Sequence, residues 1–192
     1  MFMSENEENF TDNLQKAKEA HLLYLEEVKN ELSLCNTDFK ELPPPISINV
    51  RKINEVGYIE NLSKDLPLKG MFLYYFSINN SELIFKDFQL FRNGKTSDTK
   101  LTKLNEGNKG SKYLYVGSSN SIKRRFNEHC GKAHDKTYAL KLSKWLKHAS
   151  SEIKFNYVEV IGVKQIILQH LEDALWRELK PMFGKSGANN KS

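Results

Sequence analysis

The spacing of hydrophobic residues in the first part of the chain is that of a helix. Residues 9–34 carry a seam three or four positions apart, made up of Phe10, Leu14, Ala17, His21, Tyr24 and Val28. This period predicts one long amphipathic helix with a heptad-like stripe. His21 and Ala17 are poor coiled-coil residues, so the pattern favours packing on the protein's own core. Dimerisation or partner binding through the helix is the alternative.

Beyond this helix the pattern changes to short alternating or apolar runs, which predict strands. Residues 46–50 alternate apolar and polar side chains, residues 71–78 are apolar and rich in aromatics, and residues 153–160 alternate cleanly. The run 82–91 predicts a further strand or extended segment. Residues 92–112 are polar and contain several Asn and Gly residues, which predicts a loop.

A strand followed directly by a helix is expected at the centre of the chain. Residues 113–116 have strand character, residues 117–120 are turn residues, and Ile122, Phe126 and Cys130 then recur at helical spacing. On this helix Arg125 and His129 lie four residues apart and therefore on one face, beside the hydroxyl of Tyr115.

Two more helices are expected after it. In residues 137–148 we expect Tyr138, Leu142 and Trp145 to face the core, with a basic ridge at three-residue spacing formed by Lys141, Lys144 and Lys147. Apolar residues mark a last helix over 164–179, which Pro181 ends. Glu172 lies next to its apolar stripe, where a carboxylate needs a partner, and a metal ion is one candidate.

Charge is distributed unevenly along the 192 residues, although the net charge is only +5. Residues 1–42 hold four Lys or Arg against ten Asp or Glu, whereas residues 112–148 hold nine against two. A basic region that coincides with candidate reactive groups suits a polyanion held by phosphate contacts. A solvated helix face is the alternative on charge alone.

Two cysteines far apart, Cys35 and Cys130, provide neither a disulfide framework nor a metal-binding pattern. A zinc site at His129, Cys130 and His134 lacks a fourth ligand, and we discount it. No apolar run has the length of a signal sequence or a membrane span. These features predict an intracellular, cytoplasmic protein without a membrane partner.

The ordered motifs resemble the GIY-YIG nuclease family. The segment 115–117, Tyr-Val-Gly, followed by Arg125 and His129, is similar to the second half of the family signature. The best match to the first half is the segment 70–72, Gly-Met-Phe, and Glu172 matches the metal-binding glutamate on a later helix. The resemblance implies an α+β fold with a small, mainly antiparallel three-stranded sheet flanked by helices.

The resemblance also implies a chemistry, namely endonucleolytic hydrolysis of DNA phosphodiesters with one Mg²⁺ or Mn²⁺ ion. Tyr115, assisted by His129, is expected to activate the attacking water, with its pKa lowered by nearby cations. Arg125 is expected to hold the phosphate in two-pronged fashion and Glu172 to bind the metal. The expected nucleic-acid contacts are Lys123, Arg124, Lys132, Lys141, Lys144 and Lys147.

One departure from the family pattern bears on activity, because Phe72 stands where the first motif tyrosine is expected. An inactive nucleic-acid-binding module is therefore the alternative function. Tyr74, two residues on and on the same strand face, is a substitute for the missing hydroxyl. A third hypothesis is an interaction protein whose acidic N-terminal helix recruits a partner, or forms a homodimer, or docks on the chain's own basic face.

The expected domain organisation follows from these elements. Residues 1–42 form the accessory helix, and the Pro43-Pro44-Pro45 run predicts a stiff spacer within a linker and short strand over 43–69. Residues 70–184 form the nuclease-like domain, with an insertion at about 79–111. Residues 185–192 are expected to be a flexible tail.

Overall fold

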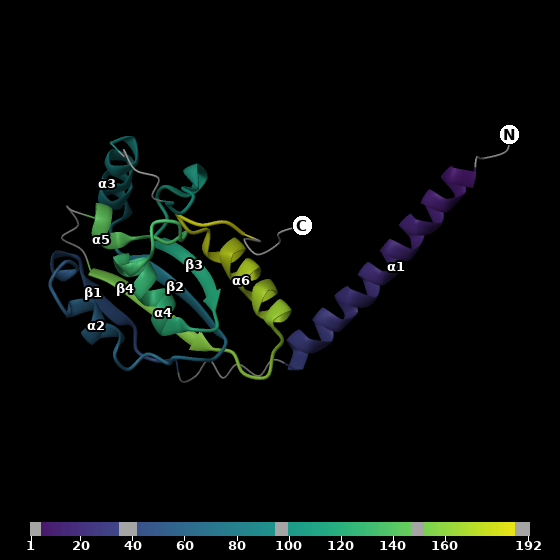
Figure 1. Cartoon of the computed structure of the whole chain (residues 1–192), viewed down its shortest axis with the longest axis horizontal. Helices are drawn as coiled ribbons and strands as arrows, with labels where there is room; N and C mark the ends of the chain where they lie inside the picture. The colour runs from purple at the N-terminus through teal and green to yellow at the C-terminus, as the bar shows by residue number, and fades with distance from the viewer. Residues whose placement is uncertain (1–4, 35–41, 95–99, 147–151, 187–192) are drawn as a thin grey trace. The chain divides into compact units, whose positions relative to one another are not determined.

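The computed structural model describes residues 5–34, 42–94, 100–146 and 152–186. The chain divides into two compact units, residues 1–36 and 37–192. The first consists of helix α1 (Glu5–Leu34), which confirms the expected long N-terminal helix (Figure 1). Several large apolar side chains on its described part are exposed, namely Leu14, Leu22, Leu23 and Leu25. Among the described residues, no helix combines the length and the apolar character that crossing a membrane requires.

The second unit is built on an antiparallel sheet of four strands in the order β1-β4-β2-β3. Its strands are β1 (Ile46–Asn49), β2 (Phe72–Ile78), β3 (Tyr113–Ser119) and β4 (Glu152–Glu159). The α+β class with a mainly antiparallel sheet is confirmed. The sheet has one strand more than the three that the family resemblance implied, because β1 pairs with the outer side of β4.

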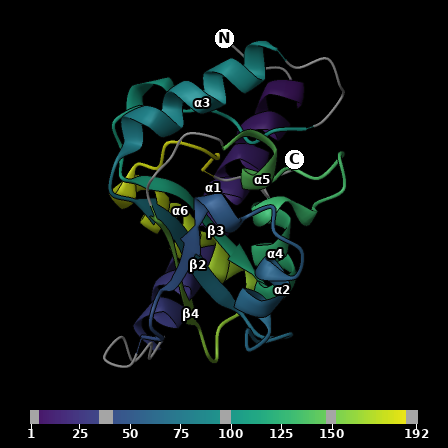
Figure 2. The ribbon, with the colours of Figure 1, turned by 90° about the vertical axis from the view of Figure 1, so that its left-hand side faces the viewer.

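Helices cover both faces of this sheet. They are η2 (Val50–Lys52), α2 (Tyr58–Ser63), α3 (Ser81–Asn93), η3 (Glu106–Asn108), α4 (Ile122–Asn127), the π-helical turn η4 (Glu128–Lys132), α5 (Leu142–Trp145) and α6 (Gln165–Leu179). Helix α6 lies along β3 and β2, α4 and α2 lie across the sheet from it, and α3 and α5 lie together at one end (Figures 1 and 2).

Alternation along β2 explains where the core forms. Phe72, Tyr74, Phe76 and Ile78 are all buried, as expected for side chains at every second position of a strand that face one layer. The ring of Phe76 stacks on that of Phe126 from α4, with ring centroids 6.4 Å apart. This layer therefore fixes α4 above the centre of the sheet, which places the side chains of α4 and η4 over β2 and β3.

The segment 43–69 is folded into the domain, which corrects its expected role as a linker with a short strand. It carries β1, η2 and α2, and five of its apolar side chains belong to the hydrophobic core: Ile48, Val50, Ile53, Ile59 and Leu66. The expected boundary at residue 42 adjoins residues 35–41, which lie outside the described residues.

The run 82–91 is helical, so the prediction of a strand there was wrong. Ile84 and Phe88 lie four residues apart and are both buried, which is the period of a helix packed on one side. The side chain of Asn80 accepts a hydrogen bond from the backbone N–H of Glu82 at 3.3 Å and caps the helix. The expected insertion at 79–111 therefore contains a helix of its own.

The segment 137–148 is mostly not helical, contrary to prediction. Only Leu142–Trp145 forms a helical turn, because Lys141 adopts a left-handed backbone conformation with φ 53° that a continuous helix does not allow. Tyr138, expected in the core, is 60% exposed, whereas Lys141 is fully buried. The basic ridge is therefore absent over the described part of this segment, and Lys147 lies outside the described residues.

Candidate active site

The site is built where β2 and β3 lie side by side. In their register Tyr74 stands opposite Gly117, and Phe76 stands opposite Tyr115. A Cβ atom at Gly117 would collide with the hydroxyl of Tyr74, so only glycine leaves room for that phenol to lie across β3. The rings of Tyr74 and Tyr115 are consequently stacked, with centroids 6.2 Å apart.

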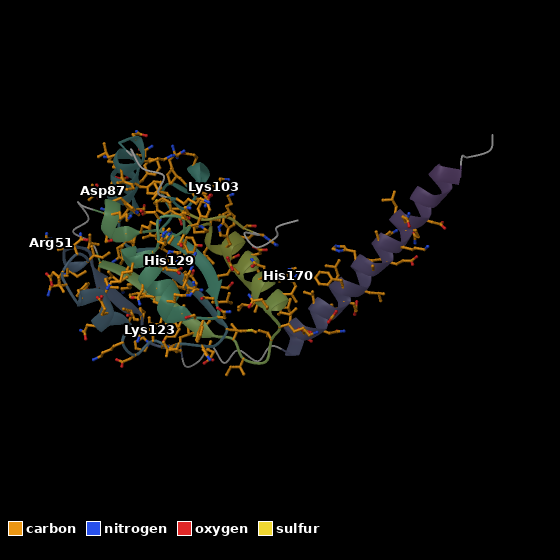
Figure 3. All side chains as sticks on the ribbon, in the orientation of Figure 1. Arg51, Asp87, Lys103, Lys123, His129 and His170 are labelled. Carbon is orange, nitrogen blue, oxygen red and sulfur yellow. The ribbon has the colours of Figure 1, made fainter. Side chains whose placement is uncertain are left out.

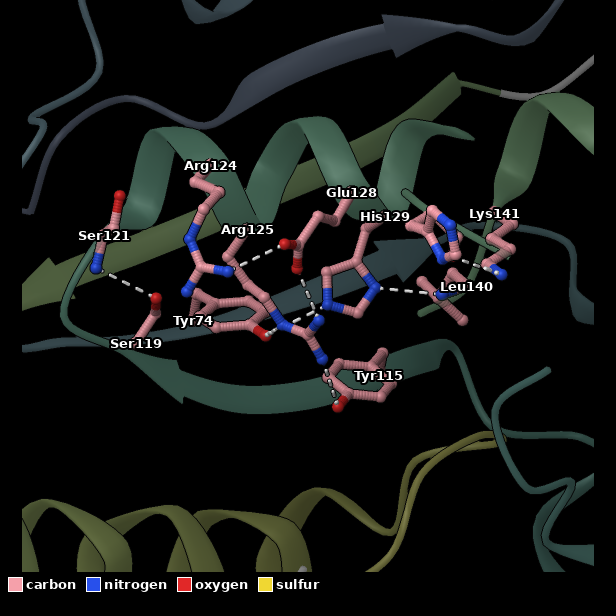
Figure 4. Close-up of polar contacts among 11 residues, drawn as sticks. Tyr74, Tyr115, Ser119, Ser121, Arg124, Arg125, Glu128, His129, Leu140 and Lys141 are labelled. Atoms are coloured by element: carbon pink, nitrogen blue, oxygen red, sulfur yellow. Dashed lines mark hydrogen bonds and ion pairs between the residues drawn. The ribbon is translucent and has the colours of Figure 1, made fainter. Parts of the chain in front are cut away.

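The hydroxyl of Tyr74 meets two side chains from α4 and η4. The Nε of Arg125 donates to it at 3.1 Å, and the Nε2 of His129 lies 3.0 Å from it (Figure 4). The predicted position of Arg125 and His129 on one face beside Tyr115 is also observed, since the Tyr115 and His129 rings lie 4.5 Å apart. His129 lies inside the second unit and is fully buried (Figure 3).

The second ring nitrogen of His129 determines which way this hydrogen bond runs. Its Nδ1 accepts the backbone N–H of Leu140 at 3.1 Å, so Nδ1 carries no proton. Burial, aided by the charge of Arg125, lowers the pKa of His129 well below its ordinary value and keeps the ring neutral. Nε2 therefore carries the hydrogen and donates it to Tyr74, so His129 is a donor to this phenol and not its base.

Arg125 is held by three partners at once. Besides Tyr74, its Nη2 donates to the hydroxyl of Tyr115 at 3.3 Å and its Nη1 donates to Oε2 of Glu128 at 2.8 Å. A guanidinium has five N–H donors, so one hydrogen on each terminal nitrogen is left for a ligand. Those two hydrogens match two oxygens of one phosphate group.

Both tyrosines have raised pKa values, which corrects the expectation that nearby cations would lower that of Tyr115. Burial is the largest cause for each, and the charge of Arg125 opposes it without overcoming it. The carboxylate of Glu172 also raises the pKa of both phenols. Glu172 therefore lies within electrostatic range of the two tyrosines.

Glu172 extends toward the site from α6, the helix that packs on the edge strand β3. It is 6% exposed, and its Oε2 accepts a 2.5 Å hydrogen bond from the hydroxyl of Ser118. Burial raises the pKa of Glu172, while Ser118 and Arg125 act in the opposite direction. The carboxylate is thus fixed through one oxygen beside the phenols, and it does not point away into solvent.

The donor set near Glu172 is small for a metal centre. Across the described ranges, no group of three or more His, Cys, Asp or Glu side chains is arranged to hold a metal ion. Mg²⁺ commonly binds through one or two carboxylates while keeping several waters and contacting substrate phosphates. A single buried carboxylate with one hydrogen-bonded oxygen fits that mode of binding, and it does not fit a closed structural zinc site.

Phe72 stands outside the cluster. Its ring is fully buried at the start of β2 and meets the ring of Tyr157 edge-on at 6.2 Å. The hydroxyl that faces Tyr115, Arg125 and His129 belongs to Tyr74. The strand register therefore places Tyr74, and not the Phe72 position of the Gly-Met-Phe segment, beside the second motif tyrosine.

The basic residues expected to contact nucleic acid have different environments. Lys141 is buried, and its Nζ donates to the carbonyl oxygens of His134 and Asp135 at 3.1 and 2.9 Å, so its role here is structural. Lys144 pairs with Asp135 at 2.6 Å. Three others lie at or near α4, namely Lys123, Arg124 and Lys132.

Two residues of the site were missed from the sequence. Glu128 orients Arg125, and Ser118 orients Glu172. The first had a signal, because an acid three residues after an arginine on a helix meets it on the same face. Ser118 had none, since its partner comes from an element 54 positions later in the chain.

Comparison with known proteins gives one match. Residues 107–185 match the family model described as the GIY-YIG catalytic domain. No curated protein and no solved structure matches the chain. The matched segment contains β3, α4, η4, β4 and α6, and with them four members of the cluster, Tyr115, Arg125, His129 and Glu172. GIY-YIG domains are nuclease domains that generally depend on a divalent metal ion, and residues 107–185 of this chain are similar to that catalytic domain.

Proposed function

We propose that this protein is a metal-dependent endonuclease that hydrolyses phosphodiester bonds of DNA. One observation carries the proposal: the phenols of Tyr74 and Tyr115, the guanidinium of Arg125 and the imidazole of His129 converge within electrostatic range of the carboxylate of Glu172. Hydrolysis of a phosphodiester needs an activated water, neutralisation of charge at phosphorus and stabilisation of the leaving oxygen.

Tyr74 orients the attacking water in this proposal, a role that the sequence had given to Tyr115 and that a protonated phenol can fill. Its oxygen accepts hydrogen bonds from Arg125 and from the Nε2–H of His129, and both donors stabilise a phenolate. Tyr115 receives the longer bond from Arg125, at 3.3 Å, and a hydrogen bond from Tyr74. We therefore propose that Tyr115 keeps the guanidinium of Arg125 oriented toward Tyr74.

Arg125 grips the scissile phosphate with the hydrogens that its protein partners leave free. Glu128 and the two phenols fix the guanidinium before substrate arrives, so little orientation is lost on binding. Glu172 holds the divalent ion, Mg²⁺ or Mn²⁺, through the oxygen that Ser118 does not occupy. When bound, that ion supplies charge neutralisation at the leaving 3′ oxygen.

The alternative of an inactive nucleic-acid-binding module rested on Phe72. The hydroxyl of Tyr74 at the cluster supports an active enzyme in preference to that alternative. The partner proposed for the rest of the surface is DNA, contacted by the basic residues of α4 and η4. A homodimer or a protein partner at α1 is a separate proposal, supported by the exposed leucines of that helix.

The test is incubation of the full chain with plasmid, linear duplex, branched and single-stranded DNA and with RNA, in Mg²⁺ and in chelator. We expect cleavage in Mg²⁺ alone that leaves 5′-phosphate and 3′-hydroxyl ends. Arg125→Ala should lose cleavage and still fold, with an unfolding midpoint lowered by the loss of its three hydrogen bonds. Metal-independent cleavage, or cleavage unaffected by Arg125→Ala, would count against the proposal.

A further inference from the structure

A hollow of about 500 Å³ lies next to α4. Its lining includes the side chains of Lys123, Arg124 and Lys132, with Glu128 as its one carboxylate and Asn127 as its amide. The lining is therefore positively charged overall. A surface of this kind suits an anionic ligand such as a phosphate group.

Glu128 connects this hollow to the proposed active site. Its Oε1 accepts from Nη1 of Arg124 at 2.9 Å, while its Oε2 accepts from Nη1 of Arg125 at 2.8 Å. Figure 4 shows one carboxylate between the two arginines, of which only Arg125 points toward Tyr115. The side chains of Glu128 and Arg125 are 14% and 18% exposed, whereas that of Arg124 is 64% exposed. Arg124 is thus the partner that is free to move.

The cations of the hollow are held by contacts that are easily exchanged. The pair of Lys132 with Glu60 is exposed on both sides, and the ammonium group of Lys123 donates to the backbone oxygen of Lys64 at 2.9 Å. Exposed ion pairs contribute little to stability. A phosphate group can therefore replace the partners of Arg124 and Lys132 at small cost.

One further group distinguishes a nucleotide from a bare anion. The Oδ1 of Asn127 is buried and has no hydrogen-bond partner within the described part of the chain. A carbonyl oxygen needs an N–H or O–H donor, and a phosphate dianion has neither. The base and sugar of a nucleotide carry such donors.

We propose that the hollow binds the nucleotide adjacent to the scissile phosphodiester, and that its phosphate draws Arg124 away from Glu128. Glu128 then holds Arg125 alone. The proposal rests on the nuclease function above. It restricts the substrate to phosphodiesters inside a nucleic-acid strand, where the neighbouring phosphates are charged. Small diesters without a neighbouring phosphate leave the hollow empty.

The experiment uses the full chain and DNA oligonucleotides whose cleavage position has been mapped. A single uncharged methylphosphonate replaces each phosphate next to the scissile one in turn, and kcat/KM is measured for the protein, for Arg124→Ala and for Lys154→Ala. Lys154 is an exposed lysine on β4, outside the hollow, and serves as the control. Unfolding midpoints verify that both variants fold.

We expect one flanking methylphosphonate to lower kcat/KM about ten-fold, the size of one lost charge-assisted hydrogen bond. Arg124→Ala should lower cleavage of the unmodified strand by a similar factor and be insensitive to that methylphosphonate, whereas Lys154→Ala should keep the full sensitivity. Nucleoside monophosphates should inhibit more strongly than inorganic phosphate.

Three results would overturn the proposal. These are tolerance of every flanking methylphosphonate, an undiminished methylphosphonate effect in Arg124→Ala, and equal inhibition by phosphate and nucleotide. Cleavage of the unmodified strand reports on the nuclease function by itself, so these failures leave that function standing. Absence of any cleavage contradicts both.

Discussion

Replacing Tyr74 with phenylalanine removes one oxygen atom from the centre of the proposed site. The change leaves two donors without an acceptor, the Nε–H of Arg125 and the Nε2–H of His129. The ring itself stays, and it keeps its packing on Phe76 and Phe155, whose ring centroids lie 6.3 and 5.7 Å away. The perturbation is therefore a loss of hydrogen bonding without a cavity.

The size of each effect follows from these contacts. A buried donor left unsatisfied costs about 1–3 kcal/mol, and His129 is fully buried, so we expect a loss of stability in that range. Loss of the group that activates the water should lower kcat by about 10²- to 10⁴-fold. Binding of DNA should change little, because Arg125 keeps Glu128 and Tyr115 as partners.

Two matched variants separate chemistry from folding. Tyr75→Phe is the same substitution one residue along β2, on the opposite face, and should leave cleavage unchanged. Tyr115→Phe removes a 3.3 Å contact to Arg125 and the contact with Tyr74, but it leaves the Nε–H of Arg125 and the Nε2–H of His129 bonded to Tyr74, so it should cost less activity than Tyr74→Phe. Plasmid nicking rates and urea unfolding measure both quantities. Full activity of Tyr74→Phe together with an inactive Tyr115→Phe would refute the assignment of the two phenols.

Three further predictions concern the fold and its pH dependence. Asn80→Ala should lower the free energy of unfolding by about 1 kcal/mol through loss of the cap of α3, with Asn79→Ala as the control in a urea titration. Lys141→Met should lower it by about 1–3 kcal/mol, because two carbonyls lose their donor, and should leave the salt dependence of DNA binding unchanged. Because burial lowers the pKa of His129, the unfolded chain takes up a proton that the folded chain excludes, so stability should fall as pH drops below about 6.5, by up to about 1.4 kcal/mol per pH unit. His129→Gln should show a smaller slope in unfolding experiments between about pH 5 and 8.

The sequence predicted the core strands and the proximity of Arg125, His129 and Tyr115 better than it predicted the connecting segments. Alternation located β4, and aromatic and β-branched residues located β2 and β3. The four-residue spacing placed Arg125 beside His129, because residues four apart share one face of a helix. The helix α3 was misread because its apolar run also has the composition of a strand. Only the cap at Asn80 and the burial of Ile84 and Phe88 distinguish the two.

The remaining errors arose from tertiary contacts that have no local pattern. Lys141 looked like a surface cation, yet its left-handed backbone and its bonds to two carbonyls bury it. Phe72 was aligned with the first motif tyrosine by its distance from Gly70, whereas the pairing of Tyr74 with Gly117 determines which residue reaches the site. Strand register is set by the facing strand, and the sequence of one strand alone does not contain it.

The most direct test of the central claim compares the full chain with its Glu172→Gln variant in a single measurement, the rate of supercoiled plasmid nicking in Mg²⁺. Glutamine keeps the size of the side chain and an oxygen for Ser118 but binds a divalent cation poorly. We predict nicking by the protein, none in chelator, and a loss of about 10²-fold or more in the variant at an unchanged unfolding midpoint. Equal nicking by the two proteins in Mg²⁺ would contradict the account.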